Sequence, residues 1–166
     1  GYPAELKELA KIAERYRQDY NQDIFIMDDA AQALGAEYNG LPIGGNHFVD
    51  ATCFSLQSIK ALTSGDGGVI TCSAMRRDYL KSRTWFGINR EYDLPNELGE
   101  RQYTLRSIDE GVGKHHMNDL SASLALSNLI GFQDRIEYRR MLAAKYDELL
   151  DVSDITIVGN EEDRKS

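Results

Sequence analysis

The chain has 166 residues, 42% of them apolar and 28% charged, and its formal net charge is −8. This composition predicts a folded chain with one core and argues against an intrinsically disordered protein. The acidic balance argues against broad electrostatic binding to nucleic acid. No run of about 20 apolar residues is present, so no membrane span is predicted. No charged-then-apolar leader opens the sequence, which predicts a cytoplasmic protein.

The first elements predict an α/β fold. Residues 3–20 have apolar residues at helical spacing after Pro3, which is typical of an amphipathic helix. The apolar run IFIMDD (24–29) predicts a strand that is buried on both faces and ends in two aspartates. Asn39 and Gly40 then form a pair typical of a hairpin turn. A helix followed by a buried strand is the element order of α/β proteins.

Two further predicted strands, VDATCFSL (49–56) and GGVITC (67–72), flank Lys60. The other predicted elements are a polar helix (75–84), a long loop (87–113), a helical region broken at Gly131 (118–150) and a strand that begins at ITIV (155–158).

Asp28 and Asp29 stand where a predicted strand ends, and ligands of open α/β sheets bind outside the carboxyl ends of strands. Successive strand residues face opposite sides, so one of the two carboxylates is expected to point toward a ligand. The alternative is structural: an aspartate here could cap a helix formed by residues 30–35.

Lys60 follows an apolar run and precedes the glycine-rich turn SGDGG (64–68). Most lysines are solvated surface charges, and the turn could simply lead into the next strand. A lysine withdrawn from water can instead attack a carbonyl, and the hydroxyls of this turn and of Ser55 suit a phosphate. A carbonyl-reactive lysine, a carboxylate at another strand end and phosphate-binding hydroxyls are what a pyridoxal phosphate enzyme needs.

The remaining reactive side chains favour structural interpretations. Cys53 and Cys72 lie in apolar runs without a CxxC pattern, which predicts buried thiols and neither a disulfide nor a metal site. His47 has no visible partner for a metal, and the adjacent His115 and His116 are expected at the surface or an interface, where one could face substrate.

The blocks DDAAQALG (28–35) and FSLQSIKALTSGDGG (54–68) closely resemble motifs of the DegT/DnrJ/EryC1/StrS family of sugar aminotransferases. WFGINR (85–90) and GVGKHHMNDLSASLALSNL (111–129) resemble further blocks, so the likeness covers essentially the whole chain.

The resemblance implies a fold-type I, aspartate aminotransferase-like large domain, with three α/β/α layers around a seven-stranded, mostly parallel sheet. Residues 1–132 would form part of this pyridoxal phosphate-binding domain. Residues 133–166 would form a connecting helix and the start of an incomplete C-terminal small domain, so the chain would be an internal fragment.

The resemblance also assigns roles. Lys60 would bind pyridoxal 5'-phosphate covalently and shuttle a proton, and Asp29 would pair with the pyridine nitrogen. Gln32 would lie beside the ring and Ser55 would bind the phosphate. In this last block the family usually has an asparagine that reaches the cofactor phosphate of the partner subunit, and the resemblance puts Lys114 of GKHHM (113–117) at its position. A lysine also suits a phosphate, as a point charge.

The implied reaction moves an amino group from glutamate to a nucleotide-linked keto-sugar, for lipopolysaccharide, surface glycan or antibiotic sugar synthesis. It implies a homodimer with shared active sites. A dehydratase branch has histidine at the lysine position, so Lys60 argues against it. A cyclitol-aminating branch and a regulatory or inactive relative stay as alternatives.

Overall fold

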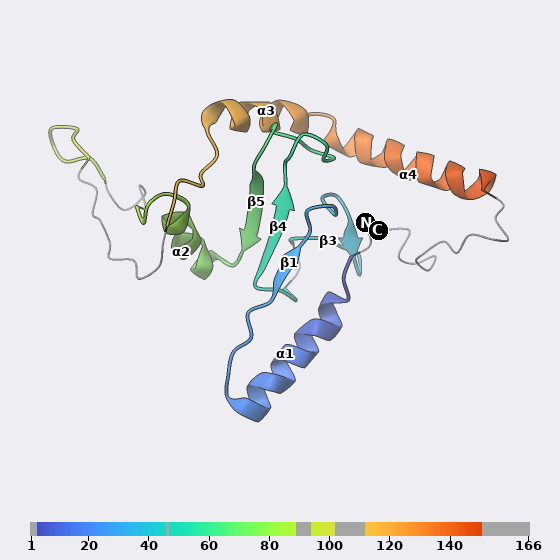
Figure 1. Ribbon diagram of the computed structural model, residues 1–166, viewed down its shortest axis with the longest axis horizontal. Coiled ribbons are helices and arrows are strands. Elements are labelled where there is room, and N and C mark those ends of the chain that lie inside the picture. Colours follow the sequence, from blue (N-terminus) through green and yellow to red (C-terminus); the bar gives the residue numbers. More distant parts are fainter. Residues whose placement is uncertain (1–2, 46, 89–93, 102–111, 151–166) are drawn as a thin grey trace. The chain divides into compact units, whose positions relative to one another are not determined.

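The computed structural model describes residues 3–45, 47–88, 94–101 and 112–150 (Figure 1). The chain divides into two compact units, which we describe separately: unit 1 (residues 1–71 and 119–166) and unit 2 (residues 72–118). The boundary expected between residues 132 and 133 falls within unit 1 and stays a prediction.

A small sheet forms the centre of unit 1. Its strands are β1 (Met27–Asp29), β4 (Ala51–Ser55) and β5 (Gly68–Cys72), in the order β1-β4-β5. β1 and β4 are parallel, and the arrows of β4 and β5 point in opposite directions (Figure 1). The predicted strands on both sides of the lysine are confirmed, and the α/β element content is as expected.

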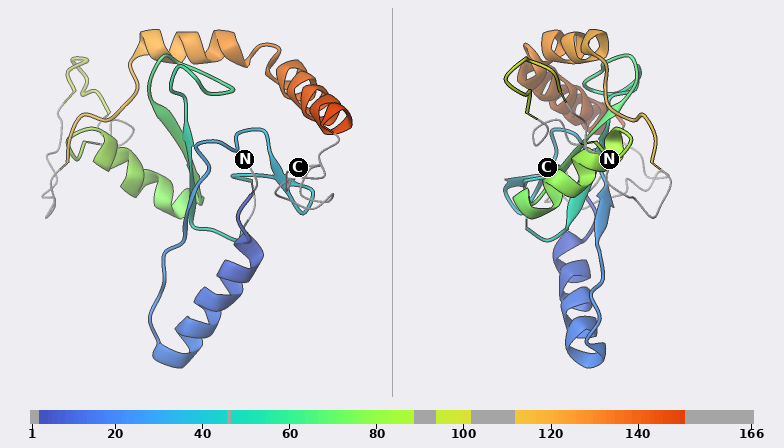
Figure 2. Two further views of the ribbon diagram at one scale, coloured as in Figure 1. Left: turned by 45° about the vertical axis from the view of Figure 1, so that its right-hand side comes forward. Right: turned by 90° about the vertical axis from the view of Figure 1, so that its left-hand side faces the viewer.

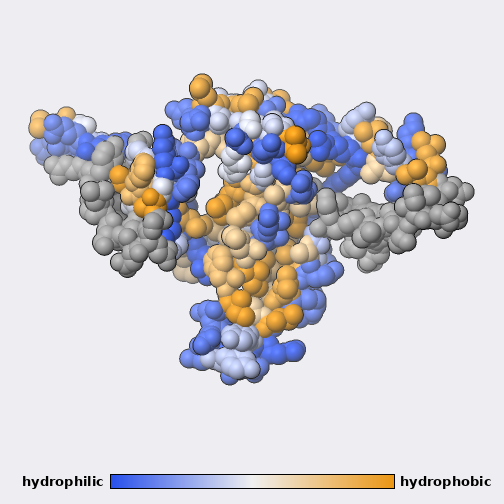
Figure 3. Space-filling view, in the orientation of Figure 1, coloured by the Kyte–Doolittle hydropathy of each residue, from blue (hydrophilic) through white to orange (hydrophobic). Residues whose placement is uncertain are grey.

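The prediction that residues 24–29 are buried on both faces is wrong for this structure. β1 is only three residues long, and Met27 is 62% exposed. Within the described residues β1 pairs only with β4, so one edge and part of its surface stay uncovered. Apolar side chains consequently gather on the exposed surface over the strands (Figure 3).

The Asn39-Gly40 hairpin is confirmed. It joins β2 (Glu37–Tyr38) to β3 (Leu41–Pro42), which are antiparallel. Asn39 has φ 53° and Gly40 has φ 73°, the positive values that a tight hairpin turn requires. The hairpin contributes Ile43 to a core cluster near β4, whose buried members are Leu6, Ala30, Ile43 and Phe54.

The helices of unit 1 are α1 (Leu6–Tyr20), α3 (Asp119–Leu129) and α4 (Phe132–Leu149), and unit 2 holds α2 (Ala74–Thr84). The predicted break between α3 and α4 is confirmed at Gly131, with φ 69°. Both ribbon figures place α3 beside the connection that follows β4 (Figure 2). The Asn128 side chain of α3 donates a hydrogen bond of 3.0 Å to the Thr63 carbonyl of that connection.

The apolar stripe of α1 is only partly packed. Leu6 and Ala13 are buried, whereas Leu9 is 44% and Ile12 61% exposed. The first turn of α1 enters the core through Leu6, and the rest of the helix extends away from the sheet in every ribbon view (Figure 2). The helical periodicity therefore predicts the element correctly but not the burial of its stripe.

Gly44 lies where a side chain would collide with the core. It has φ 83°, and a β-carbon there would lie 2.8 Å from the Phe54 ring and 2.9 Å from the Thr71 hydroxyl. We expect Gly44→Ala to lower the free energy of unfolding by about 2–5 kcal/mol, from the left-handed backbone and from overpacking. Gly40→Ala is the matched control, because Gly40 has a similar φ and no atom near its would-be side chain. Equal losses in denaturant unfolding of the full-length protein would contradict the collision.

Several expectations concern residues outside the described ones. The predicted strand at residues 155–158 and most of the loop at 87–113 are among them. Residues 94–101 of that loop are described and contain an isolated antiparallel bridge between Pro95 and Arg101. None of the described helices has the length and apolar character needed to cross a membrane.

Candidate functional site at the carboxyl ends of β1 and β4

The carboxyl ends of β1 and β4 lie side by side, because the two strands are parallel and paired in register. Asp29 pairs with Cys53, and Asp28 pairs with Thr52. Paired residues of adjacent strands face the same side of a sheet, and successive residues face opposite sides. Asp29, Cys53 and Ser55 therefore share one face, and Asp28 and Thr52 share the other.

The two carboxylates have different surroundings. Thr52, on the Asp28 face, is only 1% exposed, and burial raises the pKa of Asp28, with a further rise from the negative charge of Asp29. Asp29 is exposed, and its Oδ1 accepts a hydrogen bond of 3.1 Å from the Ala31 amide. Asp29 is consequently the carboxylate that a ligand can reach from the open face.

The segment after β1 forms turns, not a helix. The Ala33 amide donates to the Ala30 carbonyl at 2.9 Å, and the Ala36 amide donates to the Ala33 carbonyl at 3.0 Å. The helix-capping interpretation of the aspartates is therefore wrong, and Asp29 instead closes the first turn after the strand. Gln32 lies exposed in that turn, three residues after Asp29.

Lys60 lies in the connection between β4 and β5 and is half-buried. Its amide donates to the Gln57 carbonyl at 2.9 Å, and the Ile59 amide donates to the Gln57 side chain at 3.1 Å, so the backbone here is a defined turn. Within the described part of the chain, no hydrogen bond or ion pair engages the Lys60 amine. Among those residues the amine thus has no structural partner.

The hydroxyls around this connection divide into two kinds. Thr63 stabilises the loop itself, because its hydroxyl donates to the Leu56 carbonyl at 3.1 Å and accepts from the Gly65 amide at 2.9 Å. Within the described ranges the Ser55 hydroxyl only accepts, from the Gln57 amide at 3.3 Å. Its proton therefore stays available to a ligand, and Ser55 suits a phosphate better than the hydroxyl of Thr63 does.

Cys53 is the member of this face that sequence reasoning missed. Its thiol is free and half-buried, where a fully buried thiol was expected. Burial raises the pKa of the thiol, and the charges of Asp29 and Asp28 raise it further, so it stays protonated and poorly nucleophilic at neutral pH. The alternation Cys53-Phe54-Ser55 was the signal that could have placed it beside Ser55.

These side chains fit pyridoxal phosphate in their chemistry. A carboxylate has about four acceptor sites and Asp29 uses one on Ala31, so it can still accept a proton-bearing ring nitrogen. Ser55 supplies a hydroxyl donor for a phosphate, and Lys60 supplies an amine for an aldehyde carbon. Asp29 and Ser55 share a face at adjacent strand ends, and Lys60 follows in the connection after β4.

Lys114 lies in unit 2. Its side chain is exposed, and its backbone forms an isolated antiparallel bridge with Trp85. His115 and His116, which follow it, are exposed as expected. The structure therefore presents Lys114 outward from an ordered backbone, while its contact with a cofactor stays a prediction.

The described residues contain no cluster of three or more potential metal ligands among histidine, cysteine, aspartate and glutamate. His47 is exposed, and Cys72 is a free, half-buried thiol.

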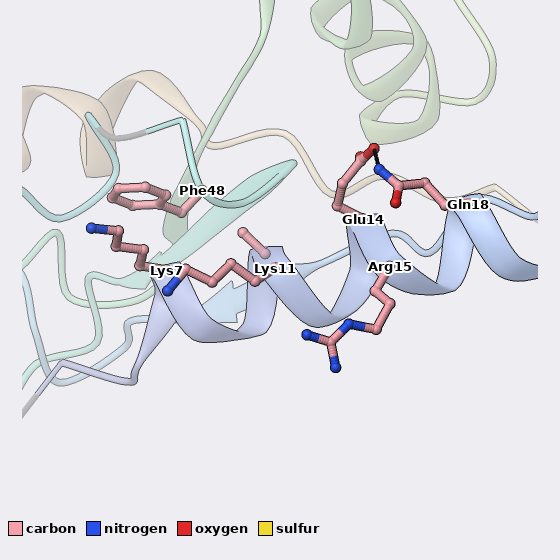
Figure 4. A pocket seen from close by; sticks show the side chains of 7 residues that line it. Lys7, Lys11, Glu14, Arg15, Gln18 and Phe48 are labelled. Atoms are coloured by element: carbon pink, nitrogen blue, oxygen red, sulfur yellow. Dashed lines mark hydrogen bonds between the residues drawn. The ribbon is translucent and has the colours of Figure 1, made fainter.

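A hollow of about 490 Å³ lies along α1. Lys7, Lys11, Arg15 and Phe48 are among its lining side chains, together with Glu14, which accepts a hydrogen bond of 3.0 Å from Gln18 (Figure 4). None of the predicted site residues lines it.

The chain matches the model of the DegT/DnrJ/EryC1/StrS aminotransferase family over residues 1–166. The UDP-4-amino-4-deoxy-L-arabinose–oxoglutarate aminotransferase of Shewanella sediminis is 32% identical over 152 residues, which are 90% of this chain and 36% of that relative.

Two solved structures are similar over almost the whole chain. AtS13 from Actinomadura melliaura is 33% identical, with a TM-score of 0.81, over 98% of this chain and 42% of that one. The sugar aminotransferase CalS13 from Micromonospora echinospora is 28% identical, also with a TM-score of 0.81, over 98% and 42%. The chain thus spans less than half the length of these relatives.

Proposed function

The chain belongs to the DegT/DnrJ/EryC1/StrS aminotransferase family, and we propose that its protein is a pyridoxal phosphate-dependent enzyme that transfers an amino group from glutamate to a nucleotide-linked keto-sugar. The observation that carries the proposal is the shared sheet face of Asp29 and Ser55, with the half-buried Lys60 in the connection that follows. A structural scaffold has no need for a reachable carboxylate, a hydroxyl donor and an unengaged amine together.

Each side chain has a separate task in this proposal. Lys60 would hold the cofactor through its aldehyde carbon and would carry a proton at Nζ. Asp29 would keep the pyridine nitrogen protonated, and Gln32 would lie beside the ring. Ser55 would donate a hydrogen bond from its hydroxyl to the phosphate. When bound, the cofactor supplies an electron sink for the carbon that loses its proton.

The proposed substrates are supported by the name of the Shewanella relative. That name contains both a UDP-linked amino sugar and oxoglutarate. Oxoglutarate is the keto acid that remains when glutamate gives up its amino group, so glutamate is the matching donor. By the same similarity we propose a fold-type I large domain and a homodimer in which Lys114 reaches the cofactor phosphate of the other subunit. The expected setting is glycan, lipopolysaccharide or antibiotic sugar synthesis in the cytoplasm.

Three rival activities are separated by specific side chains or tests. Lys60 argues against the dehydratase branch, which has histidine at that position. An aminotransferase for cyclitols would use the same cofactor residues. The identity of the amino acceptor therefore distinguishes it from a sugar aminotransferase. A regulatory relative would not turn over an amino donor.

The test is a half-reaction on the full-length protein loaded with pyridoxal phosphate. We expect glutamate to convert the bound cofactor from the aldehyde to the amine form and to release one oxoglutarate per site. Nucleotide-linked keto-sugars should then restore the aldehyde form, whereas keto-cyclitols should not. The readouts are the absorbance spectrum and the mass of the sugar product. A bound cofactor that no amino acid converts would contradict an aminotransferase and favour a regulatory protein.

A further inference from the structure

In unit 2, the turn after α2 holds the segment that carries Lys114. Trp85 and Lys114 form an antiparallel bridge, and the Phe86 amide donates to the Gly113 carbonyl at 3.2 Å. Phe86 has φ 50°, a left-handed conformation that a bulky residue keeps only where its surroundings enforce it. The backbone on one side of Lys114 is therefore fixed by this turn.

The other side of Lys114 is fixed as well. The amides of His115 and His116 both donate to the Thr84 carbonyl, at 2.7 and 3.0 Å. One carbonyl at the end of α2 thus accepts two consecutive amides, which holds the residues after Lys114 against the helix end.

The two histidine rings lie on different neighbours. The His116 ring packs edge-on against Trp85, with ring centroids 5.4 Å apart and an interplanar angle of 60°. The His115 ring lies over Gly113, because a β-carbon on Gly113 would be 2.8 Å from His115 Nε2. The His116 ring therefore joins the two segments through side chains, since Trp85 follows the end of α2.

We propose that the Trp85–His116 ring pair is a positioning element that orients Lys114 for the phosphate of the cofactor bound by the other subunit. This inference rests on the proposed function, and it adds two residues that do not touch the cofactor themselves. A lysine carries a flexible four-carbon stem, so its phosphate contact gains from a backbone that is already ordered on both sides.

The test compares the affinity of the full-length protein for pyridoxal phosphate and for pyridoxal, which lacks the phosphate. The dissociation constant for pyridoxal divided by that for pyridoxal phosphate isolates the phosphate contact from the rest of the site. We expect Lys114→Ala to lower this ratio about 10- to 100-fold, as the loss of a charge-assisted hydrogen bond predicts. His116→Ala should lower it roughly 3- to 10-fold, and His116→Phe, which keeps an aromatic edge against Trp85, should restore it.

His115→Ala is the matched control. It removes the neighbouring imidazole, whose ring lies over Gly113, and keeps the backbone hydrogen bond from residue 115 to the Thr84 carbonyl, so the ratio should stay at the wild-type value. An unchanged ratio in His116→Ala would overturn the inference. If both affinities fell equally, the cause would be general misfolding, and if neither fell, the ring pair would have no role. An unchanged ratio in Lys114→Ala would overturn the phosphate contact itself. Failure of the wild type to bind pyridoxal phosphate would instead overturn the proposed function, so the two failures are distinguishable.

Discussion

Replacing Lys60 with alanine is expected to abolish the covalent fixation of pyridoxal phosphate and to lower the transamination rate by roughly 10³-fold or more. In the proposed function the amine is both the attachment point and the group that carries the proton, and loss of a positioned proton carrier alone costs about 10²- to 10⁴-fold. The measurement is borohydride reduction of the loaded full-length protein, digestion and mass spectrometry. The wild type should carry a phosphopyridoxyl group on the peptide that contains Lys60.

Lys60→Arg separates the chemistry of the amine from its charge. Arginine keeps the positive charge and a long stem, but its guanidinium stays protonated and does not attack an aldehyde. We expect Lys60→Arg to bind the cofactor reversibly, without fixation and with the same loss of rate as Lys60→Ala. A wild-type protein that carries the modification on another lysine would show that Lys60 is a bystander. The proposed function would then lose the residue on which its chemistry depends.

The sequence predicts much of this site because local patterns determine its parts. The apolar runs place β1 and β4, and the Asn39-Gly40 pair places the hairpin. The expectation that residues 30–35 form a helix was wrong because Asp29 closes a turn with the Ala31 amide instead.

Other features depend on contacts that no local pattern encodes. Alternation alone does not tell Asp28 from Asp29, and the register with β4 is needed to place one beside Cys53 and the other beside Thr52. The hydrogen bond from the Asn128 side chain to the Thr63 carbonyl joins residues that are 65 positions apart in the sequence. For the same reason, helical periodicity predicts α1 but leaves open which part of its apolar stripe is covered.

The register between β1 and β4 leads to the second large effect, a difference between two adjacent carboxylates. We expect Asp29→Asn to lower the transamination rate by about 10²- to 10³-fold, the usual loss for one electrostatic partner of a reacting group. An amide cannot keep the pyridine nitrogen protonated, so the electron sink is weakened while the cofactor stays bound. The asparagine oxygen can still accept the Ala31 amide, so the turn after β1 is retained.

Asp28→Asn is the matched control, because it makes the same chemical change one residue away on the opposite face of the sheet. Asp28 pairs with Thr52, and its raised pKa reflects burial, so removing its charge relieves a cost in the folded protein and should leave the rate close to that of the wild type. Steady-state rates and cofactor absorbance of the two variants, measured side by side, decide the assignment. If Asp28→Asn were the inactive variant, the cofactor would lie on the Thr52 face of the sheet. Ser55 lies on the opposite face, so its proposed role in binding the phosphate would be wrong.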